Sequence, residues 1–174
     1  AGRCRCWCDW PCATRAESKR GDELCLAPAA PLTTIDFYFN ATDRLQVACR
    51  LAGKALEQRK RMLIFAPLAE VAQKLDRMLW TWPAIAFVPH CPATDALAAE
   101  TPVLIASDGE AAPVCDVLLN LWHECPAFFA RYDRLLEIVS QDEEDRSAGR
   151  SRYAWYRERG YPIRSHDLAS GGRE

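Results

Sequence analysis

Four residues near the C-terminus have the spacing of a single helix face. Arg146, Arg150, Tyr153 and Arg157 follow one another at intervals of four, three and four positions, so in an α-helix their side chains gather on one narrow side. Guanidinium groups bind carboxylates through paired hydrogen bonds, and a tyrosine ring can form one wall of an apolar pocket. The pattern predicts a site for an anion with an apolar end; a solvated basic face is the alternative.

An aromatic segment in the middle of the chain is a second candidate surface. Residues 79–90 contain Trp80, Trp82 and Phe87, interrupted by two prolines. Prolines favour an irregular surface loop, and Trp and Phe are enriched in protein interfaces. The segment is equally consistent with a lid over the core and with the anchors of a protein–protein interface.

Motifs for nucleotide chemistry are missing. The turn after the first predicted strand reads Asn40-Ala41-Thr42-Asp43 and lacks the glycines that let backbone amides cradle phosphates. No G-x-x-x-x-G-K-[ST] loop occurs anywhere in the chain. We therefore expect no nucleotide cofactor.

Motifs for covalent or metal chemistry are weak. Catalysis by a Cys/His pair would draw on Cys91, Cys125, His90 and His123, for which structural roles are the simpler interpretation. A zinc site would draw on Cys4, Cys6, Cys8 and Cys12, whose spacing departs from that of zinc fingers. We expect no catalytic residue and no bound metal.

The composition is that of one globular domain. The 174 residues are 49% hydrophobic and carry a formal net charge of -2, which argues against a generally basic nucleic-acid coat. From residue 146 onward, however, the chain holds seven arginines and three acids. The nine cysteines without a visible export signal argue against a disulfide framework. With no apolar run near the roughly 20 residues of a membrane span, we expect a cytoplasmic protein.

Periodicity divides the chain into three parts. Residues 1–32 are rich in Cys, Arg, Ala and Pro and predict a disordered extension, residues 33–168 form an α/β domain, and residues 169–174 form a flexible tail. The predicted strands are 34–39, 62–65, 103–106, 117–121 and 134–139. Strands that alternate with helices predict a three-layer, Rossmann-like domain with a mainly parallel or mixed sheet and helices on both faces.

Three helices are predicted between and after these strands. Their expected boundary residues are Thr42 or Asn40 at the start of the first, Pro67 at the start of the second, a Ser140–Glu143 capping box at the start of the third and Gly160 at its end. On the third helix Trp155 points away from the arginine face and is expected to anchor the helix to the sheet.

With these elements placed, the sequence resembles the chi subunit of bacterial DNA polymerase III, an accessory of its clamp loader. The resemblance covers about residues 33–168. It rests on Asp36-Phe37-Tyr38, Leu75-Asp76, Leu79-Trp80, Pro83, Phe87-Val88-Pro89-His90 and Arg150-x-Arg152-Tyr153-x-x-Tyr156-Arg157-x-x-Gly160-Tyr161. The Phe-Val-Pro-His string together with the Arg-Tyr helix is specific.

The resemblance implies an adaptor without catalysis of its own. Chi-like proteins link the clamp loader, usually through the psi subunit, to the acidic C-terminal tail of single-stranded DNA-binding protein, which typically ends in Phe. By position, the resemblance implies a tail site of Val139, Arg146, Arg150, Tyr153 and Arg157. It implies a partner surface of Trp80, Phe87, Val88 and Pro89 for psi or, where psi is missing, for a helicase or another clamp-loader segment. DNA would be contacted only indirectly, by a monomer within a hetero-complex.

One departure and two alternatives accompany this prediction. Ala154 stands where the family pattern has a lysine, so tail binding is expected to be weaker or less salt-sensitive. The first alternative is that the basic helix contacts single-stranded nucleic acid directly. The third possibility is a nucleotide-using α/β enzyme, which the missing phosphate loop disfavours.

Overall fold

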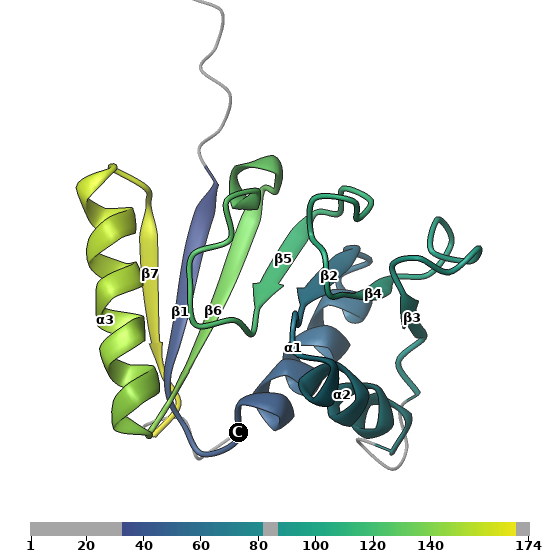
Figure 1. The fold of residues 1–174 in the computed structure, drawn as a ribbon, viewed down its shortest axis with the longest axis horizontal. Coiled ribbons are helices and arrows are strands. Elements are labelled where there is room, and N and C mark those ends of the chain that lie inside the picture. The colour runs from purple at the N-terminus through teal and green to yellow at the C-terminus, as the bar shows by residue number, and fades with distance from the viewer. Residues whose placement is uncertain (1–32, 82–86, 170–174) are drawn as a thin grey trace, which may run out of the picture.

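A seven-stranded sheet organises the part of the chain that the computed structural model describes, residues 33–81 and 87–169 (Figure 1). Its strands lie in the order β3-β4-β2-β5-β6-β1-β7, and all neighbours are parallel. The strands are β1 (Thr34–Ala41), β2 (Met62–Phe65), β3 (His90–Pro92), β4 (Val103–Ala106), β5 (Val117–Asn120), β6 (Arg134–Ser140) and β7 (Ile163–Asp167). The predicted three-layer, Rossmann-like α/β fold is confirmed, with a sheet that is parallel throughout the described residues.

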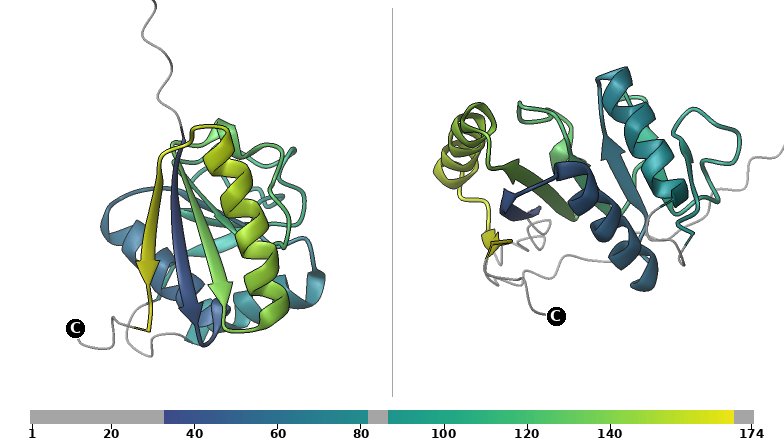
Figure 2. Two further views of the ribbon diagram at one scale, coloured as in Figure 1. Left: turned by 90° about the vertical axis from the view of Figure 1, so that its left-hand side faces the viewer. Right: turned by 90° about the horizontal axis from the view of Figure 1, so that it is seen from below.

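The helices cover both faces of this sheet (Figure 2). Helices α1 (Arg44–Glu57) and α2 (Ala69–Thr81) pack on one face, where their apolar residues share a core with Ile64, Leu119 and Ile138. Helix α3 (Glu143–Glu158) and the loops that contain the 3-10 helix η1 (Phe129–Arg131) cover the other face. The alternate residues of the central strands β2, β4 and β5 thus belong to separate cores, as a sheet covered on both sides requires.

The edge strands β3 and β7 were not predicted, and their composition explains why. The strands β2, β4 and β5 are short apolar runs because both of their faces are buried. In contrast, β7 has the sequence Ile-Arg-Ser-His-Asp and β3 has only three residues ending in Pro92. Each is defined by pairing with one neighbour, so neither has the apolar pattern that marks a central strand.

The predicted cap of α1 was wrong by a few residues. Asp43 is the N-cap, and its Oδ1 accepts hydrogen bonds from the backbone N–H groups of Leu45 (2.8 Å) and Gln46 (3.3 Å). Asn40 instead adopts a left-handed φ of 62° beside the irregularity at the end of β1, a conformation that asparagine tolerates better than most residues. Helix α2 begins at Ala69 and not at the predicted Pro67, and Leu68, which precedes the helix, is 52% exposed.

The predicted capping box of α3 is also wrong. Ser140 is the last residue of β6, and Asp142 is the N-cap. The carboxylate of Asp145 accepts the N–H of Ser140 at 2.6 Å and pairs with Arg44 at 3.3 Å, which leaves the side chain of Glu143 for other contacts. The predicted stop is confirmed, because Gly160 follows the helix with a left-handed φ of 77°.

Trp155 holds α3 in place through a loop and not through a strand. Its ring is half-buried and meets Phe129 of η1 edge to face, with ring centroids 5.9 Å apart. The guanidinium carbon of Arg159 lies 3.7 Å from the centre of the Trp155 ring. The predicted anchoring side of the helix is therefore right, although the partner is η1.

The four cysteines in the described residues are free thiols. Cys49 and Cys115 are buried, while Cys91 and Cys125 are partly exposed. Burial raises the pKa of Cys49 to about 11. The cysteines of residues 1–32, and Trp82 and Pro83 of the aromatic segment, lie outside the described residues. No helix in the described ranges is long and apolar enough to cross a membrane.

Candidate functional site

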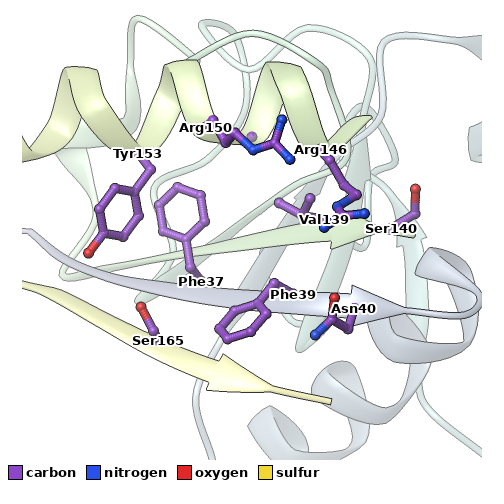
Figure 3. A pocket seen from close by; sticks show the side chains of 10 residues that line it. Phe37, Phe39, Asn40, Val139, Ser140, Arg146, Arg150, Tyr153 and Ser165 are labelled. Atoms are coloured by element: carbon purple, nitrogen blue, oxygen red, sulfur yellow. The ribbon is translucent and has the colours of Figure 1, made fainter. Parts of the chain in front are cut away.

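A pocket of about 340 Å³ lies between α3 and the strands β1, β6 and β7 (Figure 3). It is lined by Phe37, Phe39 and Asn40 of β1, Val139 and Ser140 of β6, Arg146, Gly149, Arg150 and Tyr153 of α3, and Ser165 of β7. Four of the five residues predicted for the tail site are thereby brought together: Val139, Arg146, Arg150 and Tyr153. The helix supplies the arginines and the sheet supplies most of the apolar surface.

The floor of the pocket is apolar and largely aromatic. Phe37 and Val139 are 4% and 6% exposed, while Phe39 is partly exposed. The ring of Tyr153 meets that of Phe37 edge to face, with centroids 5.3 Å apart, which is a favoured aromatic arrangement. An apolar side chain that entered here would remove apolar surface from water, at roughly 25 cal/mol per Å².

The rim of the pocket is cationic but already has one acidic partner. Nη1 of Arg150 lies 3.1 Å from Oε1 of Glu143, and Nη1 of Arg146 lies 3.7 Å from Oε2 of the same carboxylate. The spacing of the arginine face alone did not predict this acidic partner. Glu143 was assigned to a capping box, so its reach along the helix surface was missed.

Arg157 stands apart from the pocket. It is exposed, does not line the pocket, and its side chain forms no ion pair or hydrogen bond with the rest of residues 33–81 and 87–169. Ala154, where the family pattern has a lysine, is exposed beside it. That Arg157 belongs to the tail site stays a prediction.

Six of the pocket residues were not predicted: Phe37, Phe39, Asn40, Ser140, Gly149 and Ser165. The alternation of the first strand places Phe37 and Phe39 on one face, which was a usable signal. Which face lies under α3 depends on the strand order, and Ser165 sits on a strand that was not predicted. Sequence spacing could therefore find the helix side of the pocket but not its floor.

A buried ion pair fixes α3 against the sheet beneath the pocket. Glu137 of β6 is 0% exposed and accepts hydrogen bonds from Arg152 Nε (3.0 Å), the Tyr156 hydroxyl (2.9 Å) and Asn120 Nδ2 (3.1 Å). Arg152 also donates to the backbone carbonyl of His123 at 2.7 Å. Two consecutive turns of α3 are thus tied to β6 and to the loop after β5, which holds the helix against the sheet.

Burial dominates the electrostatics of this network. Desolvation raises the pKa of Glu137, against the opposing effects of the Arg152 charge and of the hydrogen bonds from Asn120, Tyr156 and Arg152. The pKa of the Tyr156 hydroxyl is raised by burial and by the neighbouring Glu137. The network consequently depends on Arg152 to keep a fully buried carboxylate stable.

Gly149 lets α3 approach the pocket floor, and Gly149→Ala should destabilise the protein by about 1–3 kcal/mol. A Cβ at this position would lie 2.7 and 3.0 Å from the two Val139 methyl groups, and valine is stiff at χ1. Gly53→Ala in α1 is the matched control, since its Cβ would meet nothing within 4 Å and should stabilise by up to about 1 kcal/mol through helix propensity. Urea denaturation measures both. Equal stabilisation by the two substitutions would show that α3 is not tightly packed on Val139.

The predicted partner surface lies near the opposite edge of the sheet. Trp80 and Phe87 are 61% and 55% exposed, and their ring centroids are 5.0 Å apart. Pro89 is partly exposed, whereas Val88 is 2% exposed and belongs to the core. Val88 can therefore support this surface but cannot present a side chain to a partner.

His90 supports this surface from below. The side chain is 0% exposed, its ring lies 5.4 Å from that of Trp80, and Nδ1 lies 2.7 Å from the Val88 carbonyl oxygen. Nε2 lies 3.2 Å from Asp76 Oδ1, without the alignment of a hydrogen bond. His90 begins β3 and packs as a structural residue.

Residues 32–164 match the family model for the DNA polymerase III chi subunit, HolC. The chain belongs to this family. It is 38% identical over 143 residues to DNA polymerase III subunit chi of Pseudomonas aeruginosa, which covers 79% of this chain and 98% of that protein. It is 29% identical over 119 residues to the Escherichia coli subunit chi, covering 68% of this chain and 81% of that protein.

The fold of this chi-family chain also occurs in an otherwise dissimilar protein. The C-terminal domain of Saccharomyces cerevisiae Dbp5, solved in complex with Gle1 and IP6, superposes with a TM-score of 0.50 at 11% identity. The match covers 76% of this chain and 90% of that one. At this identity the likeness concerns the fold alone.

The crevice at the carboxyl ends of the strands is where ligands bind in open parallel sheets. In this chi-family chain the crevice is lined by Arg44, His123, Asp142, Glu143, Glu144, Asp145 and Ala148. Four carboxylates repel a phosphate, and Arg44 is already paired with Asp145. This arrangement argues against a nucleotide at that position.

A metal site is equally unsupported by the described residues. Within residues 33–81 and 87–169 no group of three or more His, Cys, Asp or Glu side chains is placed to hold a metal ion. Cys91 lies in β3 and Cys125 in the loop after β5, and burial raises the pKa of the Cys125 thiol, the opposite of what an activated nucleophile requires.

Proposed function

We propose that this chain is a non-catalytic adaptor of the DNA polymerase III holoenzyme that links the clamp loader to the acidic C-terminal tail of single-stranded DNA-binding protein. The observation that carries the proposal is the union of an apolar floor and two arginines in one pocket. A peptide that ends in phenylalanine offers an aromatic ring and a carboxylate on the same residue. The pocket complements both groups at once.

In this proposal the terminal phenylalanine ring enters between Tyr153, Phe37 and Val139. The terminal carboxylate pairs with Arg150 at the rim, and Arg146 meets acidic residues earlier in the tail. Arg157, one turn beyond Tyr153, extends the cationic path along α3. Because the arginines are exposed, their contribution falls as salt rises.

The exposed Trp80 and Phe87 pair, with Pro89, is our candidate for the contact with psi or with an equivalent clamp-loader or helicase partner. Exposed, adjacent aromatic rings are the usual anchors of a protein interface. This surface lies beside β3, whereas the pocket lies beside β7 at the other edge of the sheet. The separation would let one molecule hold two partners together.

A titration of isotope-labelled protein with an acidic peptide ending in Asp-Ile-Pro-Phe tests the tail site. We expect micromolar binding at low salt, with NMR amide shifts concentrated at the pocket residues Phe39, Gly149, Tyr153 and Ser165. Trp80 and Phe87 should not shift and serve as an internal control. Shifts produced at the same residues by a single-stranded oligonucleotide, with none from the peptide, would favour direct nucleic-acid contact instead.

A further inference from the structure

The carboxylate of Glu143 lies where an anionic ligand of the pocket would bind. Its two oxygens face the two arginines of the rim separately, Oε1 toward Arg150 at 3.1 Å and Oε2 toward Arg146 at 3.7 Å. This is the geometry in which one carboxylate bridges two guanidinium groups. The side chain of Glu143 is 72% exposed, and within residues 33–81 and 87–169 its ion-pair partners are these two arginines.

We infer that Glu143 is an internal competitor that sets the affinity and charge requirement of the pocket. This inference rests on the proposed tail-binding function. In the free protein Glu143 is hydrogen-bonded to Arg150 and ion-paired with Arg146, and a ligand carboxylate that binds both arginines must displace it. A ligand with several carboxylates should displace Glu143 more readily than a ligand with one. It can form more ion pairs with the two arginines than Glu143 does.

The competition should be modest in size and sensitive to salt. Exposed ion pairs are weak individually, and Glu143 makes two of them. Its removal should therefore tighten ligand binding by roughly two- to tenfold at low ionic strength. The gain should shrink toward 0.5 M salt, where the screening length falls to roughly half its value at 0.1 M.

Glu144 provides a matched control for this experiment. Glu143 and Glu144 both lie in the first turn of α3, so either substitution by glutamine removes the same charge from the same end of the helix dipole. Both glutamates line the crevice at the carboxyl ends of the strands, but Glu144 forms no ion pair with any residue of the described ranges, whereas Glu143 pairs with Arg146 and Arg150. Only Glu143 touches the arginines.

The test is a fluorescence-anisotropy titration of wild type, Glu143→Gln and Glu144→Gln with the peptide ending in Asp-Ile-Pro-Phe, in free-acid and C-terminally amidated forms. We expect Glu143→Gln to bind the free acid two- to tenfold more tightly than Glu144→Gln does, with a smaller difference for the amide. Equal affinities of the two variants for the free acid would overturn the role of Glu143 and leave the tail site intact. Failure of all three proteins to bind either peptide would overturn the tail site, and the competitor with it.

Discussion

Replacement of Arg152 by methionine should lower the free energy of unfolding by about 3–5 kcal/mol, the usual cost of removing one partner from a buried ion pair. Arg152 is 4% exposed and Glu137 is 0% exposed, so the carboxylate would lose its buried counter-charge without becoming exposed to bulk solvent. Tyr156 and Asn120 would still donate hydrogen bonds to Glu137, but neither carries a charge. Urea denaturation at pH 7 measures the loss.

The double variant Glu137→Gln/Arg152→Met separates the buried charge from the lost packing. It should recover a large part of the stability that Arg152→Met loses, because it leaves no uncompensated carboxylate. If the double variant were as unstable as the single one, the loss would come from packing around Arg152 and not from an unpaired charge.

The single variant Arg152→Met should also show a characteristic pH dependence. Burial raises the pKa of Glu137 above its ordinary value, so the folded protein holds this proton to a higher pH than the unfolded chain does. The stabilisation linked to that proton is fully present below the unfolded pKa and is lost as pH rises through the folded pKa. Arg152 opposes this rise. Its removal should therefore raise the folded-state pKa of Glu137 further and widen the pH range over which the folded protein holds the extra proton. The deficit of Arg152→Met relative to wild type should therefore shrink between pH 7 and pH 5; a deficit that grows on acidification would contradict this account.

The central part of the fold could be predicted from the sequence because burial on both faces leaves a strong signal. Short apolar runs marked β2, β4 and β5. Helices α1 and α2 bury apolar residues on one face, whereas α3, which buries Gly149, Arg152 and Tyr156, was marked by its end signals. The edge strands gave no such signal, because β7 carries Arg164, His166 and Asp167. Their existence depends on pairing with β1 and β4, which no local pattern encodes.

The candidate site could be predicted only on its helical side. Spacing alone brought Arg146, Arg150 and Tyr153 together, since residues on one helix have fixed relative positions. To predict that Phe39 and Ser165 line the pocket, the strand order would have to be known, because it places β1 and β7 side by side next to α3. The same limit hid the pair of Glu137 and Arg152, which lie 15 positions apart on different elements.

The errors at the helix starts share a physical cause. Several neighbouring residues can accept the free N–H groups of a first turn, and the geometry of the incoming strand selects among them. At α1 the bulge at Asn40 shifted the cap to Asp43, and at α3 the extension of β6 through Ser140 shifted it to Asp142. The second shift released Glu143 to contact the arginines of the pocket.

Arg150→Ala should weaken the binding of the acidic peptide by about ten- to a hundredfold, since hydrogen bonds to charged groups contribute roughly 1.5–3 kcal/mol. Arg150 lines the pocket and, with a side chain 64% exposed, has no structural role that would unfold the protein when it is removed. The loss should be greatest at low ionic strength, where the attraction between exposed charges is least screened.

Two variants control for this substitution. Arg159→Ala removes the same charge from α3 but at a residue that stacks on Trp155 outside the pocket. Trp80→Ala removes an aromatic ring that is 61% exposed near the other edge of the sheet. Both should bind the peptide within about twofold of wild type, because neither side chain lines the pocket.

The most direct test of the adaptor proposal is therefore one anisotropy titration of the peptide ending in Asp-Ile-Pro-Phe against wild type, Arg150→Ala, Arg159→Ala and Trp80→Ala at low salt. The proposal predicts micromolar binding by wild type, Arg159→Ala and Trp80→Ala, and a loss of at least tenfold in Arg150→Ala alone. Equal binding by Arg150→Ala and wild type, or no binding by wild type, would contradict the assignment of this pocket to the tail of single-stranded DNA-binding protein.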